Sequence, residues 1–241
     1  MRLAEQTWTD VAEAETRLAF LPTGSTEQHG PHAPLGTDAM TADAVAEAGA
    51  AAFDGEIVVA PTIPVGIAEE HRGFDGTLWV TPDAFRRYVR EVIESLAYHG
   101  FDRVVVVNGH GGNVDALGEV CARVTRDGTA HAVPFTWFSG GSADLPMGHG
   151  GARETALLRW VAPDLVREDR IEAAREGAAD RWGEWVAGVN LAYDSDEFSE
   201  NGIVGDPDAG SAADGEALLA AAAERLAALA TAVDERAARD E

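Results

Sequence analysis

Hydrophobic residues in this chain form short continuous runs, which alternate with stretches whose apolar residues recur at helical spacing. The runs predict four strands, over Leu18 to Leu21, Glu56 to Ala60, Arg103 to Val107 and Ala130 to Pro134. The third run is β-branched without polar alternation, which is typical of a central strand buried on both faces. Strands that alternate with helices indicate an α/β fold with a mostly parallel sheet.

Helical spacing predicts helices over Asp38 to Ala52, Pro82 to His99, Val114 to Arg126, Arg153 to Val161 and Gly215 to Arg239. Thr81 before Pro82 is a favourable cap and first-turn combination. The last helix is alanine-rich with leucines at helical spacing, so we expect it to pack on the body with a structural role only.

Three stretches do not fit either pattern, namely 66–80, 139–151 and 188–211. The first two are rich in Gly, His and acidic residues, and loops of that kind often build the site on an α/β scaffold. The third contains several acidic residues and is open to three interpretations: an active-site cover, an oligomer contact or a surface loop.

Composition narrows the class of protein. The chain has 241 residues and 46% hydrophobic content, which predicts one domain over residues 1–241. Its formal charge is −24, and all 18 basic residues are arginine. Because this surface repels phosphate groups, nucleic acid and anionic membranes are poor partners. An acidic, lysine-free surface is also typical of proteins from salt-loving organisms, where salt screens self-repulsion.

No run approaches the roughly 18 apolar residues of a membrane span, so we expect a soluble, cytoplasmic protein. The single cysteine, Cys121, lies in a predicted helix and is interpreted as a small buried hydrophobe without redox chemistry.

The first candidate site residues follow the first predicted strand. Residues two apart in extended backbone point the same way, so Glu27 and His29 can share a target at the carboxyl edge of the sheet. Asp38 follows at the predicted start of a helix, after a tight Gly-Thr turn. By itself, Asp38 is equally well explained as a helix cap, and Glu27 as a capping partner.

Two further segments carry metal-type side chains on glycine-rich turns. His110 directly follows the valine strand, and three glycines around it allow a sharp turn and a close approach to a ligand. His149 and Glu154 come from a glycine-rich loop that enters a helix. Glu154 is alternatively an ordinary first-turn acid, and lone histidines such as His99 and His131 are interpreted as ordinary core or surface residues.

Convergence of the three segments favours a metal site over these simpler interpretations. Nitrogen and oxygen ligands without a thiolate suit two divalent ions, Zn, Mn or Fe, and Asp38 is the best candidate for a bridging carboxylate. A nucleotide loop is disfavoured, because neither G-x-G-x-x-G nor G-x-x-x-x-G-K-[ST] is present.

These residues resemble the creatininase (creatinine amidohydrolase) family. The resemblance covers residues 16 to 160 and rests on three groups of residues, Gly-Ser-Thr-Glu-Gln-His-Gly-Pro-His (24–32) with Gly-Thr-Asp (36–38), Glu-His (70–71) near Gly-Thr (76–77), and Asn-Gly-His-Gly-Gly-Asn (108–113). It implies a three-layer α/β/α sandwich, two divalent metals per chain and a homo-oligomer, such as a hexamer or another ring or dimer-based assembly. It implies further that Glu27 and His110 bind one metal, His29 binds the other, and Asp38 bridges them.

The chain departs from creatininase proper at one point. There the corresponding histidine is followed by a tyrosine and a metal-binding glutamate, whereas Gly111 and Gly112 stand here. We hypothesise that Glu154 replaces the missing ligand, because its loop brings His149 to the same edge. The lost tyrosine belongs to the creatinine pocket, so creatinine hydrolysis is less expected.

The resemblance is nearer the Asn-Gly-His-Gly-Gly-Asn branches, which include a formamide-removing enzyme of archaeal flavin synthesis and the peptidase that matures mycofactocin. We therefore predict hydrolysis of a C–N amide or formamide bond in a small molecule by water activated between two metals. A formamidopyrimidine nucleotide deformylase is favoured by the acidic, lysine-free composition. Creatinine hydrolysis, maturation of a peptide-derived cofactor and a non-catalytic metal-binding scaffold are the alternatives.

Roles beyond metal binding are assigned to five residues. His149 is the hypothesised proton donor to the leaving nitrogen, since histidine titrates near neutrality, with Glu154 beside it. Glu70 and His71 lie on a loop expected to face the substrate. Trp137, after the fourth strand, is a candidate wall of the substrate pocket, with burial in the core as the alternative.

Overall fold

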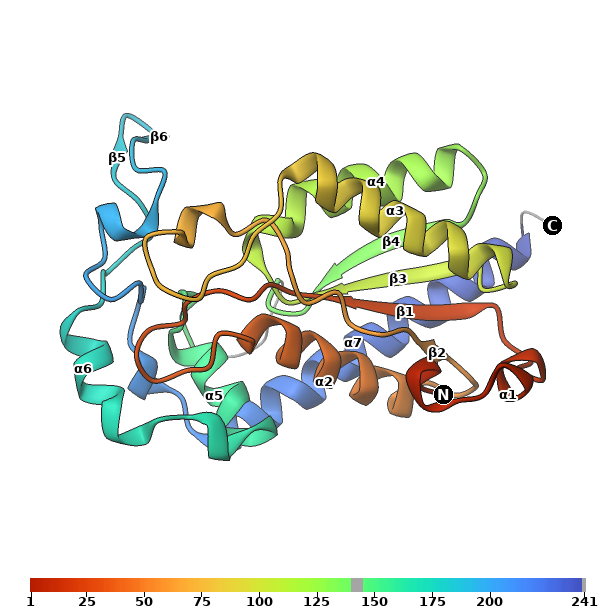
Figure 1. Cartoon of the computed structure of the whole chain (residues 1–241). Helices are drawn as coiled ribbons and strands as arrows, with labels where there is room; N and C mark the ends of the chain where they lie inside the picture. Colours follow the sequence, from red (N-terminus) through yellow and green to blue (C-terminus); the bar gives the residue numbers. More distant parts are fainter. Residues whose placement is uncertain (140–144, 240–241) are drawn as a thin grey trace.

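A parallel sheet of four strands forms the centre of the computed structural model, which describes residues 1–139 and 145–239 (Figure 1). The strand order is β2-β1-β3-β4, with β1 at Leu18–Thr23, β2 at Val58–Val59, β3 at Arg103–Asn108 and β4 at His131–Thr136. The predicted parallel sheet is confirmed. The predicted strand from Glu56 to Ala60 was too long, because only two of its residues pair with β1.

The valine strand is central, as predicted. Phe20 of β1 is in register with Val105 of β3, which is in register with Val133 of β4. Val105 and Val107 belong to one core cluster and Val104 and Val106 to the other, all of them fully buried. Alternate residues therefore pack against opposite helical layers.

Helices cover both faces of the sheet, which gives three layers (Figure 1). The helices α3 (Pro82–Tyr98) and α4 (Val114–Arg126) pack on one face. The opposite face carries α2 (Thr37–Ala52), α5 (Ala152–Val161) and α7 (Ala212–Arg239). The two remaining α-helices of the described chain are short, α1 at Trp8–Ala12 and α6 at Ile171–Glu176.

Local sequence explains how these helices begin and where they pack. Thr81 caps α3 by accepting a hydrogen bond from the amide of Ala84, and Pro82 occupies its first turn, as predicted. The α7 helix packs against α2 and α5, which confirms that it lies on the body of the protein. None of the described helices is long and apolar enough to cross a membrane.

The irregular stretches lie beyond the carboxyl ends of the strands. Residues 66–80 contain the 3-10 turn Glu69–His71, and 188–211 contain the turns Ser195–Glu197 and Pro207–Ala209. A small antiparallel hairpin, β5 (Trp185–Val186) and β6 (Val189–Asn190), projects beside them (Figure 1). Of the predicted loop 139–151, residues 140–144 lie outside the described part.

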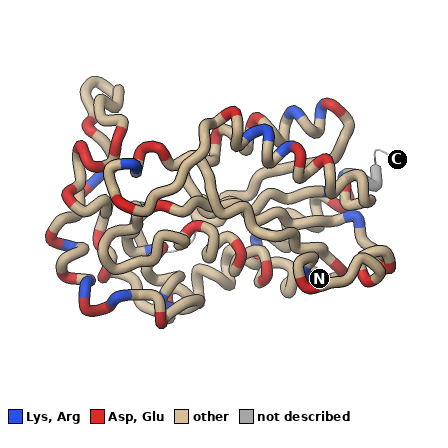
Figure 2. The backbone as a smooth tube through the Cα atoms, viewed as in Figure 1, with Lys and Arg blue, Asp and Glu red and all other residues tan. Residues whose placement is uncertain are grey.

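Acidic residues are spread along the whole backbone, and arginines are much sparser (Figure 2).

Candidate metal centre

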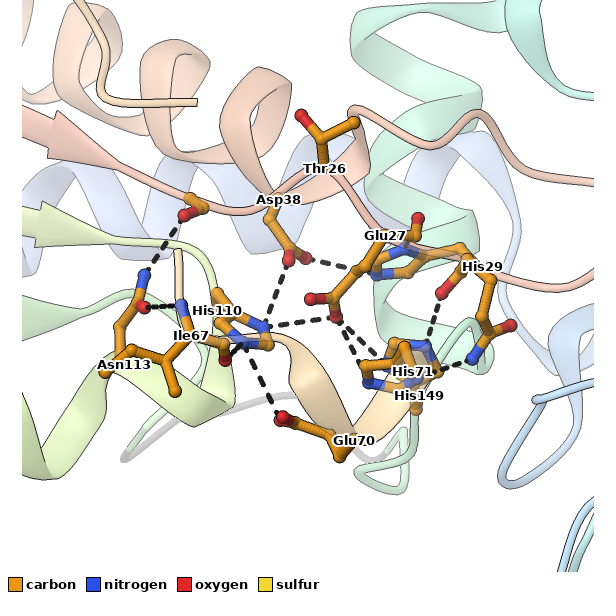
Figure 3. Close-up of polar contacts among 12 residues, drawn as sticks. Thr26, Glu27, His29, Asp38, Ile67, Glu70, His71, His110, Asn113 and His149 are labelled. Atoms are coloured by element: carbon orange, nitrogen blue, oxygen red, sulfur yellow. Dashed lines mark hydrogen bonds and ion pairs between the residues drawn. The ribbon is translucent and has the colours of Figure 1, made fainter. Parts of the chain in front are cut away.

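The loop after β1 turns two buried side chains toward the start of α2. Glu27 and His29 are fully buried, and so is Asp38 in the first turn of α2. His29 Nδ1 donates to the carbonyl of Glu27 at 3.2 Å, which leaves Nε2 3.1 Å from Asp38 Oδ1. Gly36, not Asp38, occupies the N-cap position, so the capping explanation of Asp38 is wrong. The side chains converge as the sequence predicted (Figure 3).

The loop after β3 aims His110 at the same point. The side chain of Asn108 accepts a hydrogen bond from the His110 amide at 3.1 Å and donates to its carbonyl at 2.7 Å. His110 Nε2 donates to the carbonyl of Ile67 at 2.6 Å. Its Nδ1 is therefore the nitrogen with a free lone pair, 3.1 Å from Glu27 Oε1 and 3.2 Å from Asp38 Oδ2 (Figure 3).

Gly112 is glycine because the loop 66–80 closes on it. A Cβ at this position would lie 2.3 Å from the carbonyl oxygen of Ile67, 2.5 Å from His110 Nε2 and 2.8 Å from Glu70 Oε1. The first two contacts cannot relax without moving the backbone or the hydrogen-bonded ring. The space that a side chain at 112 would take is occupied by Glu70 and Ile67, so a glutamate ligand cannot be accommodated here.

The third segment brings His149 and Glu154 to the other side of His29. His149 Nε2 donates to the carbonyl of Gln28 at 2.6 Å, and its Nδ1 lies 3.8 Å from Glu27 Oε1. Glu154 accepts a hydrogen bond from the amide of Gly150 through Oε2, and its Oε1 lies 3.6 Å from His29 Nε2. The carboxylate is thus at once a first-turn acid of α5 and a neighbour of His29.

Three groups of side chains in the described chain have the composition and spacing to hold a metal ion. Within each group the ligand atoms lie within 4.8 Å of one another, and the groups are Glu27 with Asp38 and His110, His29 with His149 and Glu154, and Glu27 with His71 and His149. Both carboxylate oxygens of Glu27, Asp38 Oδ2 and His29 Nε2 are buried without a hydrogen bond to any described residue. Buried polar atoms are rarely left so, and these donors fit divalent cations.

Electrostatics separate the two buried carboxylates. Burial raises the pKa of Glu27 to about 7, although the nearby charge of His110 opposes this. Burial would also raise the pKa of Asp38, but the charge of His29 and the contact with His110 outweigh it and hold the pKa well below its usual range. Conversely, the carboxylates overcome burial and raise the pKa of both His29 and His110.

Two other histidines are held neutral. Burial, helped by the charge of His29, lowers the pKa of His149 to about 4. Burial and the neighbouring His149 lower the pKa of His71. His71 borders the cavity but is only 1% exposed, and its Nε2 lies 3.4 Å from Glu27 Oε1.

Residues that sequence reasoning missed hold His71 in place. The side-chain amide of Gln28 lies 2.9 Å from His71 Nδ1, and Ser195 Oγ lies 3.1 Å from the same nitrogen. The Gln28 amide also donates to the carbonyl of Gly202. The stretch 188–211 therefore contacts the site through Ser195 and Gly202, which agrees with a place beside the active site, one of its three interpretations, although no local pattern singled out these two residues.

A cavity of about 330 Å³ opens over the cluster. Its walls are four acidic residues, three histidines, three glycines and three large apolar residues, namely Glu27, Asp38, Glu70, Glu154, His71, His110, His149, Gly111, Gly112, Gly148, Phe138, Met147 and Trp182. The interpretation of Trp137 as a pocket wall is wrong. Trp137 lies in the same core cluster as Phe135, two residues earlier on the same face of the chain, and is 2% exposed. Trp182 provides the aromatic wall instead.

A parallel α/β sheet with a buried carboxylate–histidine cluster at its carboxyl edge is the arrangement expected of a metal-binding enzyme. A model of the creatininase family, described as creatinine amidohydrolase, matches residues 4–230. The chain belongs to the creatininase family.

Individual relatives refine this placement. The chain is 38% identical over 208 residues to the mycofactocin precursor peptide peptidase of Mycolicibacterium smegmatis, covering 84% of this chain and 80% of that protein. It is 29% identical over 199 residues to the creatinine amidohydrolase of Pseudomonas putida, covering 70% and 75%. The sequence-based placement nearer the Asn-Gly-His-Gly-Gly-Asn branches than creatininase proper is confirmed, and of these branches the relatives support the peptidase branch.

Solved structures share the fold. A putative creatinine amidohydrolase from Bacteroides fragilis has a TM-score of 0.81 at 23% identity, covering 97% of this chain and 96% of that one. A manganese form of creatininase has a TM-score of 0.74 at 23% identity, covering 98% of each chain.

Proposed function

We propose that this protein hydrolyses an amide bond with water activated between two divalent ions. Glu27, Asp38 and His110 would hold one ion, His29 and Glu154 the other, and Asp38 would be shared. The observation that carries the proposal is the set of buried carboxylate oxygens and the His29 nitrogen that form no hydrogen bond to any described residue. When bound, the ions would lower the pKa of water and polarise the substrate carbonyl.

Glu154 is the proposed replacement for the ligand that Gly112 cannot supply. Its Oε1 lies 3.6 Å from the only ring nitrogen of His29 that has no hydrogen bond, so one ion can contact both. We therefore propose two ions per chain, with zinc, manganese or iron as the candidate metals.

His149 is the proposed proton carrier. Its pKa of about 4 keeps the ring neutral, and the bond to Gln28 fixes the proton on Nε2. The lone pair of Nδ1 therefore faces the cavity, where it takes the proton of the attacking water and passes it to the leaving nitrogen. Neutral His149 thus acts as base first and as acid second, which extends the donor role assigned from sequence.

A peptide-derived amide is the proposed substrate. Similarity to peptidases of mycofactocin precursors supports this class. A formamide, such as a formamidopyrimidine nucleotide, is the second candidate, favoured by the acidic, lysine-free composition. Creatinine is disfavoured because Gly111 offers no aromatic side chain. A homo-oligomer is also proposed, and sedimentation analysis would test it.

Parallel assays of metal content and turnover test the proposal. Protein loaded with Zn, Mn or Fe would be incubated with a short peptide, a formamidopyrimidine nucleotide and creatinine, and the products measured by mass spectrometry. We expect two ions per chain and cleavage of the peptide. Tight binding of metal without turnover of any amide would favour the non-catalytic scaffold instead.

A further inference from the structure

The only nitrogen bases among the described walls of the cavity are three histidines. Its described walls carry four carboxylates but neither arginine nor lysine. Residues 140–144, which the structure does not describe, are Gly, Gly, Ser, Ala and Asp, and the whole chain is free of lysine. Outside the proposed ions and the three histidines, neither the described walls nor the side chains of residues 140–144 therefore supply a counter-charge for an anionic substrate group.

The arginine next to Glu154 does not change this. Arg153 donates from Nε to the carbonyl of Leu145 at 2.7 Å and from Nη1 to the carbonyl of Phe138 at 3.1 Å. Arg153 is also absent from the described walls of the cavity. Its guanidinium thus joins the chain on either side of residues 140–144, and it borders a smaller adjoining cavity rather than this one.

Glu70 is the cavity carboxylate that the metal proposal does not use. Its side chain is 24% exposed, and Oε1 lies 3.8 Å from His110 Nε2, the ring nitrogen turned away from Glu27 and Asp38 (Figure 3). No arginine forms an ion pair with Glu70 in the described part of the chain. The carboxylate is therefore available to a substrate group beside the scissile amide.

We infer that the substrate carries an uncharged or amino-bearing group next to the scissile amide, and that Glu70 excludes carboxylates and phosphates from that position. This inference rests on the proposed function. A like charge in a partly buried cavity is strongly unfavourable, whereas an N–H donor gains a charge-assisted hydrogen bond. Trp182 adds an aromatic wall, which suits an amino group or an apolar peptide side chain.

The substrate class becomes narrower as a result. A peptide amide whose neighbouring terminus is blocked or amino-bearing fits the cavity. A peptide with a free carboxylate there, or a nucleotide whose phosphate must enter, does not fit. Glu70 is thereby a specificity-determining residue, and its close approach over Gly112 depends on the missing side chain at that position.

Three matched peptides test the inference. Acetyl-Gly-Leu-Tyr would be prepared with a carboxamide, an aminoethyl amide and a free carboxylate at its C-terminus. Turnover by Zn-loaded enzyme and calorimetric binding would both be measured. We expect the first two peptides to exceed the carboxylate by at least about tenfold in kcat/KM and affinity.

Variants of two neighbouring glutamates show whether Glu70 causes the preference against the carboxylate peptide. Glu70→Gln should reduce the preference to about threefold or less, because it removes the repelling charge while keeping the shape. Glu69→Gln is the control, since Glu69 is exposed and pairs with Arg72. The inference would be overturned if the carboxylate peptide had the same kcat/KM and affinity as the other two peptides. An unchanged preference in Glu70→Gln would also overturn it. If metal binds but no peptide is cleaved, the proposed function fails, while the binding ratios still decide the role of Glu70.

Discussion

Glu154 Oε1 lies 3.6 Å from His29 Nε2, although the two residues are far apart in the sequence. His29 follows β1, and Glu154 lies in the first turn of α5. In the proposed centre, both residues bind the second ion. In that proposal, Glu154 takes the place of the ligand that Gly112 cannot supply.

Glu154→Gln should therefore remove one ion and leave the other. The amide keeps the size of the side chain but binds a cation more weakly, whereas Glu27, Asp38 and His110 stay intact. Metal analysis after dialysis should fall from two ions per chain to one, and Glu172→Gln on the exposed surface of α6 should keep two. Retention of both ions at full affinity would disprove the replacement-ligand hypothesis.

Asp38→Asn should be more severe, because both proposed ions share this carboxylate. We expect loss of both ions at micromolar metal and a fall in kcat of about a thousandfold or more, as the bridged water would no longer be activated. Asp43→Asn, on the same helix, is the control, since Asp43 pairs with Arg2 at the surface. Near-normal turnover by Asp38→Asn would contradict the shared-ligand assignment.

Glu27 links pH to the stability of the metal-free protein. Its pKa rises from 4.5 to about 7 on folding, so its contribution is fully present below pH 4.5 and is lost as pH rises through 7. The loss at pH 8 is on the order of 3 kcal/mol. In EDTA, Glu27→Gln should be more stable than the natural protein at pH 8 but not at pH 5, by urea denaturation.

With excess zinc at pH 8, the natural protein should become more stable to urea than Glu27→Gln. Only the natural protein then gains the full free energy of zinc binding. If the two proteins show the same pH dependence in EDTA, Glu27 is not the group responsible. Glu69→Gln again serves as the exposed control.

The two tryptophans near the site should separate stability from substrate binding. Trp137→Ala should cost about 3–5 kcal/mol of unfolding free energy, because it empties a fully packed core position. Trp182→Ala should mainly raise KM, since Trp182 borders the cavity. Thermal denaturation and steady-state kinetics of both variants would check this. A raised KM in Trp137→Ala at normal stability would restore the pocket-wall interpretation.

Salt should stabilise the protein, because its net charge of −24 is self-repelling. The effect should be largest between low salt and about 1 M KCl, over which the screening length falls to about 3 Å. Thermal denaturation across a KCl series would measure it. A melting temperature that does not rise over this range would argue against adaptation to salt.

The sequence by itself determined the succession of strands and helices along the chain. It also indicated the main candidate ligands of the metal centre. The valine run can only be buried on both faces, and parallel strands place their carboxyl-end loops at one edge, so Glu27, His29, Asp38 and His110 had to converge. The ends of the strands were harder to predict from the sequence. The strand β2 pairs with β1 over two residues only, and the extent of pairing depends on the neighbouring strand as well as on the local sequence.

Only the tertiary structure decided which further residues reach the site. Ser195, Gln28 and Trp182 contact the cluster or its cavity through packing between distant segments, which leaves no local pattern. Trp137 was a candidate from the sequence that the structure places elsewhere. Successive residues at the end of a strand face opposite sides, so Trp137 lies in the core and the next residue, Phe138, borders the cavity. The spacing of apolar residues determines local helices and strands. Contacts between distant loops depend instead on how those loops pack against one another in the folded protein.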